Sequence, residues 1–218
     1  MRMRSLCAVG MCLFVGTAAA VDYTWLGGSG LFSDPAMWSP STNYPSDGDR
    51  ALFGTAADVT VTWSGDVANN EMQIVQTGGG TLGLNLGGNT YTLTNRFYFD
   101  GANAGSRVVV GNGFLTVPTN TCEVKINAGV APARLTFGDG AVVNMDRFTS
   151  WRSDVFVETG AVVTVNNECK IGDNAANSLN TLNVDGGTLN THFRLFLPNN
   201  GGANSTSVLN ITAGKMTS

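Results

Sequence analysis

One short pattern returns at nearly constant spacing through residues 108–218. It consists of two apolar residues two positions apart, a glycine three positions after the second, and another apolar residue two positions after the glycine. The glycines of the five copies are separated by 27, 20, 27 and 27 residues. A period in this range is typical of a repeat architecture. The copies occupy 108–115, 135–142, 155–162, 182–189 and 209–216, and their glycines are Gly113, Gly140, Gly160, Gly187 and Gly214.

The spacing within each copy predicts short β-strands that bury one face. Apolar residues two apart, such as Val155 and Val157, point to the same side of a strand, while Phe156 between them points outward. The glycine bends the chain, and the apolar residue two positions later begins the next inward-facing strand. A unit of 20 to 27 residues cannot bury its own apolar face, whereas stacked units share one core. The sequence therefore predicts an all-β fold, a right-handed parallel β-helix, with the hand taken from the usual hand of parallel crossovers.

A β-sandwich is the alternative fold, because turn signals every 8 to 12 residues or so also fit it. A sandwich gives no reason for a register of 27 residues, so the β-helix is preferred. Leucine-rich repeats need a leucine and asparagine signature that this chain lacks, and propeller blades need about 40 residues or more.

Residues 1–20 have the organisation of a secretory signal peptide. Arg2 and Arg4 give a positive start, 6–15 form an apolar run, and three alanines that end at Ala20 form a small-residue cleavage site. The apolar run is too short to span a bilayer, and we expect no transmembrane segment in the mature chain. We expect cleavage after Ala20 and a secreted or cell-surface location.

The charge of the mature chain argues against two classes of partner. Removal of two leader arginines leaves ten Lys and Arg against 16 Asp and Glu, a net charge of −6. Nucleic acids and anionic membranes attract basic proteins, so neither is an expected partner. Charged residues make up only 13% of the chain and Gly numbers 28, a composition of strands and turns rather than helices.

Two cysteines, Cys122 and Cys169, remain after removal of the leader. Export to an oxidising compartment favours a disulfide between them. They lie nine residues after Gly113 and Gly160, so the repeat places them two coils apart, or about 9.6 Å at about 4.8 Å per coil. A disulfide tolerates a Cα separation of up to about 7 Å. We therefore expect two unpaired, mostly buried thiols.

Residues 21–57 do not follow the repeat and are rich in aromatic and turn-forming residues. Stacked repeats need a cover over their open apolar end, so we expect an N-terminal cap built on Trp25, Trp38 and Phe53. A sugar-binding platform of these side chains is the alternative. Residues 58–218 are expected to form the β-helix repeats. Because the pattern stops in mid-repeat, we expect the chain to be the N-terminal part of a longer protein.

The repeat also resembles a known group of proteins. The segment 171–189, with Ile-Gly-Asp-Asn followed by Leu-Asn-Val-Asp-Gly-Gly-Thr-Leu, and its echo at 209–214 resemble the repeats of autotransporter passenger domains and PEP-CTERM-associated surface proteins. The stretch 25–38 with 45–53 looks like the segment that commonly starts such passengers. The resemblance implies a stalk or adhesin-like display scaffold at the bacterial outer membrane, without assigned catalytic residues. Polysaccharide or the surface of a host or neighbouring cell is the implied partner.

Three carboxylates near the repeat glycines are the candidate catalytic residues. Glu158 and Asp185 lie two residues before their glycines on successive coils, so we expect them to stack, with Asp139 one coil below. Glycosidases place two carboxylates about 5 to 10 Å apart across a sugar. Glu158 and Asp185 are also the candidates for a calcium site, because Ca²⁺ takes six to eight oxygen ligands. Ordinary solvated turn residues are the third interpretation, and no other cofactor is expected.

Other catalytic constellations find little support in the sequence. A polysaccharide lyase needs a basic residue beside the carboxylates, and the basic residues of the repeats look scattered. His192 is the only histidine, which excludes metal sites built on several imidazoles. Asn183 and Asn210 recur one coil apart and are expected to form an amide ladder. The scattered basic residues are Lys125, Arg147, Arg152, Lys170 and Arg194.

The sequence thus favours a structural or adhesin-like surface module with no catalytic activity. A carbohydrate-active β-helix enzyme, either a polysaccharide lyase or a glycoside hydrolase, is the alternative from another class. A carbohydrate-binding module is the third hypothesis, with Phe114, Phe156 or Trp151 as exposed aromatic side chains on which a sugar stacks.

Overall fold

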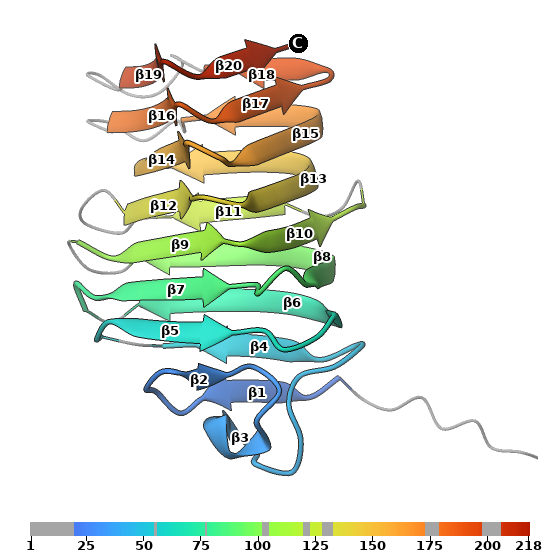
Figure 1. Cartoon of the computed structure of the whole chain (residues 1–218). Helices are drawn as coiled ribbons and strands as arrows, with labels where there is room; N and C mark the ends of the chain where they lie inside the picture. The colour runs from blue at the N-terminus through green and yellow to red at the C-terminus, as the bar shows by residue number, and fades with distance from the viewer. Residues whose placement is uncertain are drawn as a thin grey trace, which may run out of the picture.

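The computed structural model describes residues 20–54, 56–76, 78–101, 105–119, 123–127, 133–172, 179–197 and 206–218. These ranges contain 20 β-strands and one 3-10 helix, η1 (Pro35–Met37). The named strands form two sheets of 12 and eight strands that wind around a common axis (Figure 1). Within the described residues, no helix is long and apolar enough to cross a membrane.

The fold is a right-handed parallel β-helix, as the repeat predicts. Strands on adjacent coils pair in parallel, and the pairing of β1 (Asp22–Trp25) with β3 (Trp38–Ser39) is antiparallel. In Figure 1 the chain crosses the front from left to right, returns behind from right to left and climbs, which makes the coil right-handed. The sandwich alternative is excluded because equivalent repeat residues lie in parallel ladders, not in hairpins.

Each full coil has three sides, which we call face 1, face 2 and face 3 in the order of the chain. Face 1 is the eight-stranded sheet, and faces 2 and 3 are the two halves of the 12-stranded sheet, because four long strands bend around the corner between them. Face 1 consists of β2 (Gly30–Leu31), β5 (Val59–Thr62), β7 (Thr81–Asn85), β9 (Arg107–Gly111), β12 (Ala133–Phe137), β14 (Ser153–Glu158), β16 (Leu179–Asp185) and β19 (Thr206–Thr212).

The larger sheet contributes the other two sides. The bent strands are β6 (Val67–Gln76), β8 (Thr90–Gly101), β13 (Ala141–Trp151) and β15 (Val162–Ile171). Face 2 is completed by β10 (Gly113–Val117), β17 (Thr188–Thr191) and β20 (Lys215–Thr217). Face 3 is completed by β1, β4 (Arg50–Phe53), β11 (Glu123–Asn127) and β18 (Arg194–Phe196), with β3 beside β1.

The inward residues of face 1 form columns that run through the coils. One column pairs Val110 with Phe137, Phe137 with Val157 and Val157 with Val184. These four side chains are at most 1% exposed, and each stabilises the fold by roughly 1.5 to 3 kcal/mol through burial. Ile211 continues the column in the last described coil, where it is 50% exposed. The core is therefore continuous along the axis.

The corner after face 1 differs from the expectation in two of the five copies. Val142 is 38% exposed, whereas Val143 beside it is 1% exposed. The cause is an additional turn residue, since Gly113 pairs with Ala141 rather than with Gly140. The same corner occurs one coil later, where Val163 rather than Val162 is buried. The glycines of the repeat therefore occupy two kinds of corner position, and the prediction that Val142 and Val162 point inward is wrong.

Cys169 is a free, buried cysteine, as predicted. Burial, followed by the nearby Glu168 carboxylate, raises the pKa of its thiol to about 12. The predicted alignment with Cys122 is wrong, because Cys169 pairs with Phe148 and Phe148 pairs with Val124 two coils below. Cys122 itself lies outside the described residues.

Aromatic side chains close the N-terminal end of the stack. The ring of Trp25 lies 4.9 Å from that of Trp38 and 5.7 Å from that of Phe53, while Phe32 stacks on Trp63 at 4.6 Å. The indole of Trp38 donates to the carbonyl of Phe32 at 2.7 Å. Each of these rings is at most 4% exposed. They form a cap, and their burial excludes the sugar-platform alternative for them.

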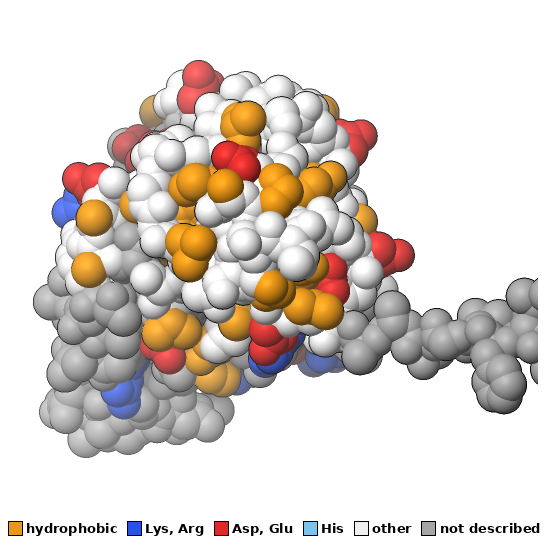
Figure 2. Space-filling model, turned by 90° about the horizontal axis from the view of Figure 1, so that it is seen from below, with side chains coloured by type: hydrophobic (Ala, Val, Ile, Leu, Met, Phe, Trp, Pro, Cys, Tyr) orange, Lys and Arg blue, Asp and Glu red, His pale blue; other side chains and the backbone are white. Residues whose placement is uncertain are grey.

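The outer surface of this end is mixed in character. Figure 2 shows it from below, with apolar side chains interspersed among polar and acidic ones. Parallel stacking reaches into the capping segment, because β1 pairs with β4 and β4 with β6. The cap is thus continuous with the first coils of the β-helix.

Candidate functional site

The outward side of face 1 places the candidate carboxylates in one region. The register aligns Asn85 with Gly111 on the next coil. Phe137 is aligned with Val110, so the residues after them, Gly138 and Gly111, lie level on adjacent coils. The backbone N–H of Gly138 donates to the Val110 carbonyl at 2.9 Å. The same outward column continues through Glu158 to Asp185. Two glycines therefore interrupt a column of polar side chains.

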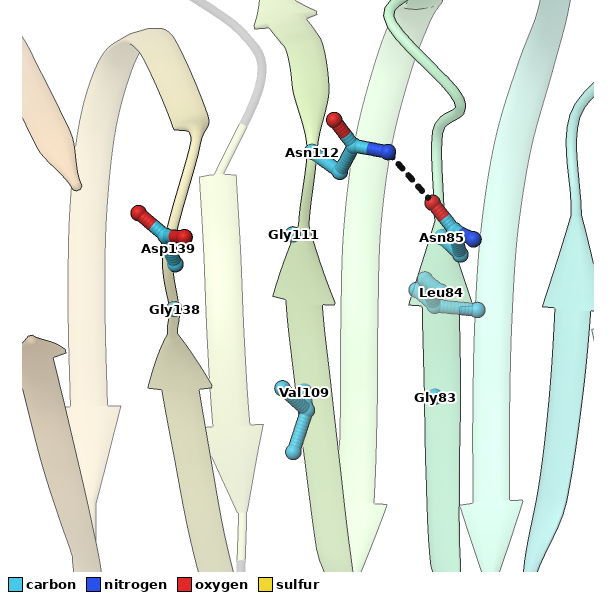
Figure 3. A pocket seen from close by; sticks show the side chains of 8 residues that line it. All are labelled: Gly83, Leu84, Asn85, Val109, Gly111, Asn112, Gly138 and Asp139. Atoms are coloured by element: carbon cyan, nitrogen blue, oxygen red, sulfur yellow. Dashed lines mark hydrogen bonds between the residues drawn. The ribbon is translucent and has the colours of Figure 1, made fainter. Parts of the chain in front are cut away.

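These glycines open a shallow depression of about 330 Å³ on face 1 (Figure 3). Gly83, Gly111 and Gly138 line it together with Val109. The amide of Asn112 donates to Asn85 Oδ1 at 3.1 Å along one rim, and Asp139 lies on the following coil. The remaining lining residues are Leu84, Asn85, Asn112 and Asp139.

The backbone does not require glycine at two positions of this depression. A Cβ added at Gly111 would come no closer than 3.4 Å to another atom, and one at Gly138 no closer than 3.6 Å. Both residues have ordinary φ values. A glycine in a strand is less favourable than a residue with a side chain, and it often marks a place where something approaches closely.

The structure stacks Glu158 on Asp185 in the register. Adjacent strands are about 4.8 Å apart, so the two carboxylates lie within the range that a glycosidase uses. Asp139 occupies the neighbouring corner column, where its Oδ1 lies against Gly160 on the next coil. All three carboxylates are exposed to solvent. A general acid is usually held in an apolar pocket, and this region offers an open surface.

The described residues near this corner do not provide a cluster of metal ligands. Among the described residues, no group of three or more His, Cys, Asp or Glu side chains is arranged to hold a metal ion. His192 is exposed and lies at another corner, between faces 2 and 3, where its backbone N–H donates to the Val165 carbonyl. A calcium site on Glu158 and Asp185 stays a prediction.

Two of the five basic residues named from the repeats, Arg147 and Arg194, lie in an ordered column of charges on face 3. At the start of face 3, each coil contributes one charged residue to a column in which the sign alternates. We call this column the charge ladder. Its members in chain order are Asp22, Arg50, Glu71, Arg96, Glu123, Arg147, Glu168 and Arg194.

Side-chain contacts join the first members of the charge ladder. Arg50 Nε donates to Asp22 Oδ1 at 2.6 Å, and this hydrogen bond lowers the pKa of the Asp22 carboxyl. Arg96 Nε lies 2.8 Å from Glu71 Oε1. The Glu71 side chain is only 4% exposed, so its charge needs a partner. Arg50 and Arg96 thus pair with carboxylates of adjacent coils on face 3, away from the carboxylates of face 1.

No simple sequence signal reveals the charge ladder. Its members are separated by 28, 21, 25, 27, 24, 21 and 26 residues, because loops and corners differ in length from coil to coil. A search at fixed period therefore misses it. The pairing of the strands alone brings these residues into one column.

Amide and hydroxyl side chains form further contacts between coils. Asn210 donates to Asn183 Oδ1 at 2.8 Å, which confirms the predicted amide ladder. Asn166 donates to Asn144 Oδ1 at 2.7 Å on face 2. Polar groups on the outer surface are thus paired along the axis at several places.

The three aromatic candidates for sugar stacking lie on different faces. Phe114 is 46% exposed on face 2, Phe156 lies on face 1 and Trp151 on face 3. The guanidinium of Arg134 covers the Phe156 ring, 4.4 Å from its centroid. They therefore do not form one platform.

Fold and surface together define a class of protein, the right-handed parallel β-helices, with a capped N-terminal end and charged and polar ladders between coils. The chain matches no protein-family model, no curated protein and no solved structure.

Proposed function

We propose that this chain is a structural, stalk or adhesin-like module of an exported cell-surface protein and has no catalytic activity. The observation that supports this best is the charge ladder, a column of charges of alternating sign in which Asp22 pairs with Arg50 and Glu71 with Arg96 across adjacent coils. Together with the asparagine pairs, these contacts link adjacent coils along the axis of the rod. A rod of this kind suits display of a partner-binding end at a distance from the cell.

The sequence adds two supports for export. Residues 1–20 have the three regions of a secretory leader, and β1 begins at Asp22, two residues after Ala20. A net charge of −6 for the processed chain suits a surface that does not adhere to nucleic acid.

Export is tested by expressing the full chain in a Gram-negative host. We expect the protein in the periplasmic or surface fraction and a mass that corresponds to loss of residues 1–20. A variant without these residues is the control, and it should remain in the cytoplasm. Recovery of the full chain in the cytoplasm with its leader intact would contradict the proposal.

An assay with beads coated with the processed chain distinguishes adhesion from catalysis. We expect retention of the beads on polysaccharide-coated or cell-coated surfaces, and loss of retention with heat-unfolded chain. Release of reducing ends or unsaturated uronates from the polysaccharide would overturn the non-catalytic proposal. If release occurs, its loss in Glu158→Gln and Asp185→Asn would assign the activity to these carboxylates.

Binding of a polysaccharide to face 1 is a second candidate function, favoured by the depression over Gly111 and Gly138. The amides of Asn85 and Asn112 and the Asp139 carboxylate offer donors and acceptors at its rim, as sugar hydroxyls require. Gly111→Thr would fill the depression while leaving the backbone undisturbed.

Affinity for a polysaccharide panel gives the test of this second function. Gly111→Thr should weaken binding, whereas Gly54→Thr should not, since Gly54 lies outside the depression. A Cβ added at Gly54 would come no closer than 3.6 Å to another atom, so the control variant is also free of steric conflict at Cβ. Equal affinity of both variants and the wild type would reject face 1 as the binding surface.

A further inference from the structure

Val21 lies at the boundary between the expected leader and the first strand. It is 38% exposed, and β1 begins at the next residue, Asp22. Because Asp22 pairs with Arg50 in parallel register, Val21 lies beside Asp49 of the following coil. The peptide bond between Ala20 and Val21 is thus in exposed chain, immediately before β1.

Asp49 already holds the nitrogen of Val21. Its Oδ1 accepts a hydrogen bond from the Val21 N–H at 3.0 Å. Its Oδ2 accepts from the N–H and the hydroxyl of Ser46, both at 3.1 Å. The Val21 carbonyl accepts from the Arg50 N–H at 2.9 Å. The loop therefore fixes the carboxylate, and the pairing with Arg50 fixes Val21 beside it.

We propose that cleavage of the Ala20–Val21 bond turns the Val21 nitrogen into an α-ammonium group that forms an ion pair with Asp49 and fastens the first coil of the mature protein. Hydrolysis adds the hydroxyl of water to the Ala20 carbonyl carbon as the C–N bond breaks. The Val21 nitrogen takes up the other proton of water and the proton that the new Ala20 carboxyl group loses as it becomes a carboxylate. This inference rests on the proposed function, because the export route supplies the peptidase.

The new charge completes an alternating arrangement. Asp22 on the first coil faces Arg50 on the second, and the ammonium of Val21 would face Asp49 with the signs reversed. Opposite charges would then be neighbours both along each strand and between the coils. Charged side chains on the segments around the Val21 nitrogen are Asp22, Asp47, Asp49, Arg50 and Glu71, with Arg96 paired to Glu71.

The ion pair has a measurable signature in the pKa of the terminal amine. An α-amino group ordinarily has a pKa of about 7.7 to 8.0, and a nearby carboxylate raises it. A raised folded-state pKa contributes stability that is fully present below the unfolded-state pKa. That contribution is lost as the pH rises through the folded-state pKa.

The experiment uses exported chain whose N-terminus has been established by mass spectrometry. Its amines are ¹³C-dimethylated, and the pKa of the terminal amine is measured by NMR titration in wild type, Asp49→Asn and Asp47→Asn. We expect a pKa roughly 0.5 unit higher in the wild type than in Asp49→Asn, as for an exposed ion pair. Asp47→Asn, in the same loop, should match the wild type.

A chain that begins at Ala20 gives a second control, because its ammonium lies one residue away from Asp49. Its terminal pKa should equal that of Asp49→Asn. Equal pKa values in the wild type and Asp49→Asn, or an exported N-terminus other than Val21, would overturn this inference alone. Cytoplasmic retention with the leader intact would overturn the proposed function as well.

Discussion

Arg96 and Glu71 form an ion pair across two adjacent coils, with 2.8 Å between Nε and Oε1. Glu71 is nearly buried, and Arg50 faces it from the coil on the other side. Glu71 thus lies between Arg50 and Arg96 of the two neighbouring coils. This arrangement favours one order and register of coils, because a shift by one coil would bring like charges together.

The first prediction concerns this pair. Arg96→Ala leaves the Glu71 carboxylate buried without its closest partner, and we expect a loss of about 2 kcal/mol in the free energy of unfolding. Arg194→Ala is the matched control, because Arg194 is exposed at the end of the charge ladder. It should cost under about 0.5 kcal/mol. Urea unfolding measures both, and equal losses would contradict the assigned role of Glu71 burial.

The pH dependence of the Asp22–Arg50 pair provides the second prediction. The hydrogen bond from Arg50 lowers the pKa of the Asp22 carboxyl below its ordinary 3.8. A lowered folded-state pKa contributes stability above the unfolded-state pKa, and this contribution is lost as the pH falls through the folded-state pKa. Asp22→Asn should therefore have a lower Tm than the wild type near pH 7, and the two should converge in strong acid. A constant difference in Tm at all pH values would contradict this cause.

Corner glycines differ in what they tolerate, which gives the third prediction. Gly160 has a φ of 83°, and a Cβ there would lie 2.1 Å from Asp139 Oδ1. We expect Gly160→Ala to lower the free energy of unfolding by at least about 1 kcal/mol. Gly111→Ala should change it by less than about 0.5 kcal/mol, because its backbone is ordinary and its surroundings are open. Similar losses in both variants would show that the corner geometry is misassigned.

Thiol reactivity gives the fourth prediction. With a pKa near 12 and a side chain 1% exposed, the Cys169 thiol is protonated and shielded at pH 8. In the processed chain carrying Cys122→Ser, labelling by a maleimide should be at least about 100-fold slower in the folded protein than in urea. Rapid labelling of the folded protein would mean that face 3 opens or is packed differently.

The inward pattern was predictable from the sequence because burial acts on every coil alike. Val110, Phe137, Val157 and Val184 recur with the chain's own period, and an alternating apolar pattern has few other ways to be buried. The stacking of Glu158 on Asp185 followed from the same register. Asp139 was expected in the column of Glu158 and Asp185 but lies in the neighbouring corner column. The sequence does not show where the corner at Gly140 takes up an additional residue.

The sequence by itself determined the stacked all-β architecture and its aromatic N-terminal cap, because these follow from local alternation and composition. Tertiary structure alone decided which polar side chains meet. Coils of unequal length bring Asp22, Arg50, Glu71 and Arg96 into one column although no fixed spacing relates them. Charge pairing depends on distances across strands, and those distances exist only after the register of the whole stack is set.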